Sequence, residues 1–167
     1  MSTPVELTRH FDRELGNLKQ DLLRMAALAE TAVSKSVESV TNRDSDRARE
    51  VIIDDITLNR MELAIEEQAF KLLALRQPVA TDLRLTVAAM RIATELERIG
   101  DQAVNIAERA LELNSRPPLE LPIDIKLMAE MALGMVRTSI DAFVNQDPKL
   151  ALQVCQRDVE VDILDDE

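Results

Sequence analysis

Residues 85–113 read LTVAAMRIATELERIGDQAVNIAERALEL, a stretch without proline and with a single glycine, Gly100. Apolar residues recur along it at alternating intervals of four and three positions, which is typical of a helix in a left-handed bundle. Residues 80–114 are therefore predicted to form one long bundle helix. Glycine inside a helix costs about 1 kcal/mol relative to alanine, so Gly100 is expected to mark the close approach of a neighbour. The expected core seam is Leu85, Ala89, Ile92, Leu96, Ile99, Ala103, Ile106, Ala110 and Leu113.

Further segments of helical periodicity precede and follow this one. Prolines or turn-forming residues separate them, because proline disfavours the continuation of a helix. The chain has only 3 aromatic residues (Phe) and 3 glycines, a composition that suits helix–helix packing better than sheets. The sequence therefore predicts an all-α protein, with further helices at residues 5–42, 46–76, 123–145 and 147–167.

The two halves of the chain resemble each other when one is shifted by 103 residues. The shift places Met25-Ala26 on Met128-Ala129 and Asn42-Arg43-Asp44 on Asn145-Gln146-Asp147. Self-similarity at a fixed offset indicates a duplicated structural unit. We expect two tandem repeats of a three-helix up-down bundle, residues 1–116 being the first and residues 119–167 an incomplete second. The second repeat lacks its third helix in this chain, so its two helices are expected to expose an apolar face.

The charge balance excludes several classes of function. There are 20 Lys and Arg against 31 Asp and Glu, a net charge of −11, which argues against nucleic acid as a partner. No apolar run is long enough for direct membrane insertion, and no secretory segment opens the chain, so a cytoplasmic location is expected. We find no Gly-rich phosphate loop and no Ser/His/Asp set, and therefore expect a protein that is not an enzyme.

Acidic residues form stripes along three of the predicted helices. Residues three and four apart share a helix face, where like charges repel each other. A cation or a basic partner would relieve this repulsion, although a plain solvated acidic face is the alternative. All donors are oxygen atoms, which favours Mg²⁺, Ca²⁺, Mn²⁺ or iron over structural zinc. The stripes are Asp55, Asn59, Glu62 and Glu66, then Glu97, Asp101, Asn105, Glu108 and Glu112, then Asp158, Asp162 and Asp165.

The segments ATDLRL at 80–85 and ELERIGDQAVNIAE at 95–108 resemble the signature of the PhoU family. The resemblance extends over essentially the whole chain and includes the duplicated three-helix design. It implies a regulatory adaptor that represses the phosphate-starvation response and restrains phosphate uptake when phosphate is plentiful. In that family the adaptor links a phosphate ABC transporter to a sensor histidine kinase.

The resemblance also implies metal-binding residues. Some family members bind metal clusters through acidic residues four positions apart, and Glu97/Asp101 and Asp158/Asp162 match that spacing. Asp55 departs from it, because Asn59 stands in the last place. The expected cofactor is a divalent or iron-type metal at these carboxylates. The alternative function is accordingly a metal-binding helical bundle for cation storage or metal-dependent chemistry.

The expected macromolecular partners are the kinase and the transporter ATPase, together with a second copy of the chain in a homodimer. Contact with the transporter would hold the protein at the inner face of the membrane. The candidate partner-binding residues are Asp82, Arg84, Arg98, Glu97 and Asp101.

Overall fold

The computed structural model describes residues 4–76, 78, 80–118 and 124–165, with side chains described between residues 10 and 158. Its elements are α1 (Pro4–Thr41), α2 (Ser45–Arg76), α3 (Ala80–Asn114), α4 (Ile125–Asn145) and α5 (Pro148–Asp165). The all-α prediction is confirmed, and the predicted helix ends lie within two residues of the observed ones. The predicted start at residue 123 and end at residue 167 fall outside the described residues.

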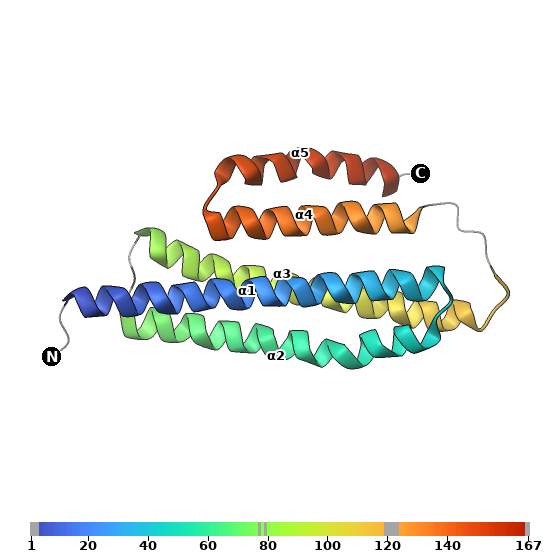
Figure 1. Cartoon of the computed structure of the whole chain (residues 1–167), viewed down its shortest axis with the longest axis horizontal. Coiled ribbons are helices and arrows are strands. Elements are labelled where there is room, and N and C mark those ends of the chain that lie inside the picture. Colours follow the sequence, from blue (N-terminus) through green and yellow to red (C-terminus); the bar gives the residue numbers. More distant parts are fainter. Residues whose placement is uncertain (1–3, 77, 79, 119–123, 166–167) are drawn as a thin grey trace.

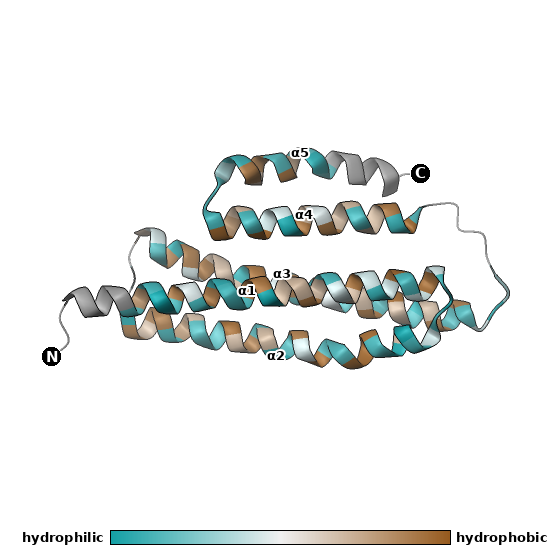
Figure 2. Ribbon diagram, viewed as in Figure 1, coloured by the Kyte–Doolittle hydropathy of each residue, from teal (hydrophilic) through white to brown (hydrophobic). Residues whose placement is uncertain are grey.

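Helices α1, α2 and α3 run up, down and up in one bundle (Figure 1). Apolar bands alternate with hydrophilic ones along each of them, as expected for helices that bury one side (Figure 2). The bundle core contains Leu18, Leu22 and Met25 from α1, Ile65 from α2 and Leu96 from α3. The residues that hold the bundle together are thus aliphatic, in keeping with the low aromatic content.

The buried face of α3 differs from the predicted seam. Only every second member of the seam is fully buried, and between these members the small residues Ala93, Gly100 and Ala107 take the buried positions. Ile92 and Ile99 are only partly buried and lie toward the side. The physical reason is that α3 packs against both α1 and α2, so its narrowest face enters the space between them.

The duplication is visible in the two helix–helix turns. Arg43 and Gln146, which are 103 positions apart, both have left-handed backbone geometry, with φ of 55° and 54°. The next residue closes the same backbone hydrogen bond in each turn: Asp44 N–H donates to Ser39 O at 3.0 Å, and Asp147 N–H donates to Ala142 O at 2.8 Å. Both are Schellman-type helix ends with a left-handed residue at C′.

The same two turns start their second helix in the same way. The carboxylate of Asp44 accepts from the backbone N–H of Asp46 and Arg47, and that of Asp147 accepts from Lys149 and Leu150. Asp44 and Asp147 are therefore the N-caps of α2 and α5. Helix α3 begins at Ala80, so Thr81 lies inside the helix and is not its N-cap.

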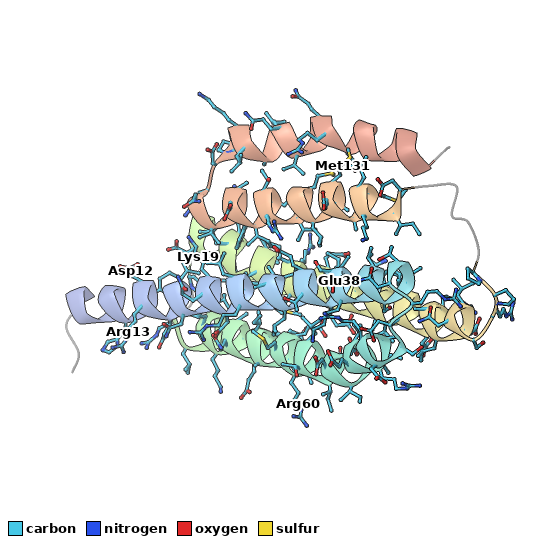
Figure 3. All side chains as sticks on the ribbon, turned by 45° about the vertical axis from the view of Figure 1, so that its right-hand side comes forward. Asp12, Arg13, Lys19, Glu38, Arg60 and Met131 are labelled. Atoms are coloured by element: carbon cyan, nitrogen blue, oxygen red, sulfur yellow. The ribbon has the colours of Figure 1, made fainter. Side chains whose placement is uncertain are left out.

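Helices α4 and α5 form an antiparallel hairpin that rests on the bundle through α1 (Figure 1). Ile140 of α4 joins the bundle core. Two polar contacts support this packing: Lys19 Nζ donates to Val144 O at 3.0 Å, and Arg137 pairs with Glu30. Figure 3 shows Lys19 on the side of α1 that faces α4. Within the described residues, none of the helices combines the length and apolar character that crossing a bilayer requires.

An apolar groove of about 480 Å³ remains between the hairpin and α3. Ala132, Ser139 and Val154 line it. Their counterparts in the first repeat, 103 positions earlier, are buried residues of the bundle. Positions that are buried in the first repeat thus line an open groove in the second.

Candidate functional site

The candidate site lies at a close approach of α2 and α3, at Gly100. A Cβ atom at this position would lie 2.6 Å from Leu58 Cδ1 and 3.4 Å from Asp55 Oδ1. The first distance is far shorter than a van der Waals contact, so a side chain at position 100 would displace Leu58, and glycine lets Leu58 sit this near to the α3 backbone. The prediction that Gly100 marks a close approach is confirmed.

This close approach encloses two polar side chains of α2. Asn59 Nδ2 donates to Asp55 Oδ2 at 3.1 Å. The other oxygens, Asp55 Oδ1 and Asn59 Oδ1, are buried and have no hydrogen-bond partner among the described residues. Buried oxygen atoms without a donor are costly, because they have lost their hydration without replacement. The pair therefore offers two acceptor atoms to a proton donor or a cation.

Burial and neighbouring carboxylates raise the pKa of two groups here, Asp55 and Glu97. Burial raises the pKa of Asp55, and the charge of Asp101 raises it further, while the hydrogen bond from Asn59 opposes the rise. Burial also raises the pKa of Glu97, followed by the charges of Asp101, Glu62 and Asp55. Asp55 and Glu97 thus lie within electrostatic range of acidic neighbours on both helices. We call Asp55, Asn59, Glu62, Glu97 and Asp101 the carboxylate cluster.

Replacing Asp55 by asparagine is expected to increase stability at neutral pH. An acid whose pKa is raised by folding binds more protons when folded, so its ionisation weakens the fold as the pH rises through that raised pKa. Asp55→Asn removes this penalty at pH 7, and the gain should vanish below about pH 4, where the wild-type carboxyl is protonated in both states. Urea unfolding of both proteins at pH 7 and at acidic pH measures it. A variant less stable than wild type at pH 7 would contradict the expectation and indicate a cationic partner for Asp55.

The structure brings together some of the predicted site residues and separates others. Glu97 and Asp101 belong to the carboxylate cluster. Asp158 lies on α5 and lines the apolar groove instead, and the side chain of Asp162 lies outside the described residues. In the described part of the chain, no three Asp, Glu, His or Cys side chains converge closely enough to hold one metal ion. The carboxylates of the cluster are thus within electrostatic range of each other without forming a ready ligand set.

The predicted partner-binding residues extend along α3. Asp82 is half-buried in the first turn, and Arg84 is exposed beside it. Arg98 is exposed and pairs with Glu95 one turn earlier, Nη1 to Oε2 at 3.0 Å. Because this pair is exposed, it contributes little to stability and leaves Arg98 free to exchange partners.

The most enclosed member of the cluster, Asp55, was excluded from the predicted site. The spacing rule required a carboxylate at position 59, where the chain has asparagine. The signal that could have found it was the placement of two acids, Asp55 and Glu62, on the core seam of α2. A charged residue on a core seam is costly unless the neighbouring helix leaves room for it.

A bundle of this kind, built by duplication and with carboxylates at the contact of its second and third helices, defines a class of helical proteins rather than one activity. The PhoU domain family matches residues 22–110 and 125–167. The chain belongs to the PhoU family.

Similar proteins agree with this assignment. The chain is 39% identical over 152 residues to the phosphate-specific transport system accessory protein PhoU homolog of Aquifex aeolicus, covering 91% of this chain and 69% of that protein. It is 38% identical to the homolog of Caulobacter vibrioides, with 92% and 67% covered. Among solved structures, PhoU from Pseudomonas aeruginosa matches with a TM-score of 0.84 at 37% identity, covering 91% of this chain and 73% of that one. The phosphate transport system regulatory protein PhoU from Streptococcus pneumoniae matches with a TM-score of 0.85 at 29% identity, covering 92% and 72%.

Proposed function

We propose that this protein is a regulatory adaptor that represses the phosphate-starvation response and restrains phosphate uptake when phosphate is plentiful. It would do so by linking the phosphate ABC transporter to a sensor histidine kinase, and it would act from the cytoplasmic face of the membrane. The observation that carries the proposal is membership of a family whose named relatives are accessory proteins of phosphate transport. An adaptor needs surfaces rather than a reaction centre, so we propose no enzymatic activity.

The negatively charged surface of α3 supports such a role. Asp101 is exposed, and Glu97 and Asp82 are partly exposed along the same helix. Acidic groups on a surface attract basic patches of a partner and speed its docking. The exposed Arg84 and Arg98 would complement acidic groups of the same partner, so that orientation as well as attraction is specified.

Loss of the gene is expected to switch the starvation response on in phosphate-rich medium. Secreted phosphatase activity should rise several-fold, and expression of the wild-type protein should return it to the repressed level. The variants Asp82→Lys, Glu97→Lys and Asp101→Lys should restore repression poorly, because each reverses a charge on the proposed partner surface.

Glu130→Lys is the matched control for these variants, since it makes the same charge change at an exposed position of α4. It should restore repression fully. Circular dichroism of each purified variant separates loss of contact from loss of fold. Phosphatase activity that stays low after deletion would overturn the regulatory function, whereas full repression by all three variants would overturn only the proposed surface.

A second candidate function is cation binding at the carboxylate cluster. The orphaned oxygens of Asp55 and Asn59 favour it, because they are the hard donors that Mg²⁺, Mn²⁺ or iron prefers. Glu97 and Asp101 would complete the ligand set after small side-chain movements, and Asp158 with Asp162 would form a separate pair on α5. Elemental analysis of the purified protein tests this function. Stoichiometric metal that is lost in Asp55→Asn would support it, and metal-free wild-type protein would refute it.

A further inference from the structure

The outer face of α2 carries large apolar side chains that no other described helix covers. Ile53, Ile56, Leu63 and Phe70 are 71%, 53%, 63% and 56% exposed. With Arg60 and Glu67 between them, they follow intervals of three and four residues, which places all six on one side of the helix. We call Ile53, Ile56, Arg60, Leu63, Glu67 and Phe70 the outer stripe.

The outer stripe lies opposite the buried seam of α2. The core-facing residues Val51, Leu58 and Ile65 are at most 3% exposed, and each stands about half a helical turn away from the stripe. Figure 3 shows Arg60 pointing away from the bundle, on the side of α2 remote from α1. Helix α2 therefore has two apolar faces, and the bundle uses only one of them.

An exposed apolar stripe of this length is a mark of an interaction surface. Single exposed apolar residues are ordinary, but contiguous apolar patches on a soluble protein indicate a site where another surface binds. The Leu63 and Phe70 end of the stripe is also hollowed, with Ala74 and Leu75 in the lining of the depression. A helix laid along the stripe would cover all four large side chains at once.

The arrangement of charges in the stripe suits a second copy of the same helix. Arg60 precedes Leu63 by three residues and Glu67 follows it by four, which corresponds to about 4.5 Å and about 6 Å along the helix axis. A second α2 laid antiparallel, with a two-fold axis near Leu63, brings each Arg60 to the level of the other copy's Glu67. Ile56 and Phe70 lie seven residues on either side of Leu63, so they also meet each other across the axis.

We propose that the outer stripe of α2 binds the outer stripe of a second copy of this chain, with the two α2 helices antiparallel and a two-fold axis near Leu63. The stripe is self-complementary in this direction, as a two-fold interface requires. A parallel pairing would place Arg60 on Arg60 and Glu67 on Glu67, and like charges in contact are unfavourable. Glu67 already holds Lys71 at 2.7 Å in one copy, and Arg60 of the second copy joins this exposed pair.

Sedimentation equilibrium of the full chain tests the proposal, which is independent of the regulatory function. Wild-type protein is expected to form a dimer. Arg60→Glu and Glu67→Arg should each weaken it about tenfold or more, because each creates two like-charged contacts across the axis. The double variant Arg60→Glu/Glu67→Arg should restore the dimer, since the two ion pairs return with their signs exchanged. A 1:1 mixture of the two single variants should dimerise more strongly than either alone.

Disulfide trapping locates the two-fold axis independently of the charges. In a Cys155→Ser background, Leu63→Cys should give a covalent dimer under mild oxidation, because the two copies of position 63 meet at the axis. Leu28→Cys, on an exposed position of α1, should not. A wild-type protein that stays monomeric overturns the proposal. This holds also if the stripe then proves to bind a helix of another protein. A dimer that survives Arg60→Glu and resists trapping through position 63 overturns it as well.

Discussion

Leu22→Ala is expected to lower the free energy of unfolding by about 2–5 kcal/mol. Leu22 is 0% exposed and belongs to the core that α1, α2 and α3 share with Ile140 of α4. Truncation removes buried methyl groups and leaves a cavity, because helices pinned by their other contacts close in only partly. Urea denaturation followed by circular dichroism measures the loss.

Leu28→Ala is the matched control for this experiment. It makes the same chemical change in the same helix, but Leu28 is 37% exposed and has already lost part of the benefit of burial. Its expected loss is below about 1.5 kcal/mol, since partial burial scales the hydrophobic contribution. Equal losses for the two variants would show that the core is not where the structure places it.

Two glycine substitutions are expected to change stability in opposite directions. Gly100→Ala should destabilise the protein by about 1–3 kcal/mol, because the new methyl group would lie 2.6 Å from a buried Leu58 carbon. Gly16→Ala should stabilise it by up to about 1 kcal/mol, because alanine is the better helix former. At Gly16 nothing lies within 4 Å of the added carbon. Thermal and urea unfolding of the two variants measure the difference.

A double variant tests the cause of the Gly100 effect. Adding Leu58→Ala removes the atom that the new methyl group meets, so the cost of Gly100→Ala should be smaller in that background than in the wild type. Additive losses would mean that the strain at Gly100 arises elsewhere, for example at Asp55.

The helices and their ends could be predicted from the sequence because they depend on local chemistry. Asp44 and Asp147 cap their helices through their own side chains, and the 103-residue offset carries the turn geometry with it. Which face of a helix enters the core is a tertiary property. In α3 the spacing of apolar residues could not decide whether Ile92 or Ala93 is the buried residue. Ala93 is buried because α3 packs against both α1 and α2, where the smaller side chain fits.

The candidate site was only partly predictable for the same reason. Glu97 and Asp101 stand out as a spaced pair in the sequence. Asp55 belongs with them because α2 meets α3 at Gly100. The glycine indicates that a neighbour approaches there, but the sequence does not say which residue of which helix it is. The outer stripe of α2 is a related case. Helix α2 has two apolar faces, both with helical spacing, and only the packing of the bundle decides which face is covered.

The contact at Gly100 has a mechanical consequence. Leu58 sits in a notch of α3 that has no side chain, so sliding α2 along α3 would drive it against the larger residues above or below. The two helices are therefore expected to resist sliding past each other at this contact. The α4–α5 hairpin contacts the bundle through α1 and has no comparable contact with α2 or α3 among the described residues. Motion in this protein is expected to concentrate at that second boundary.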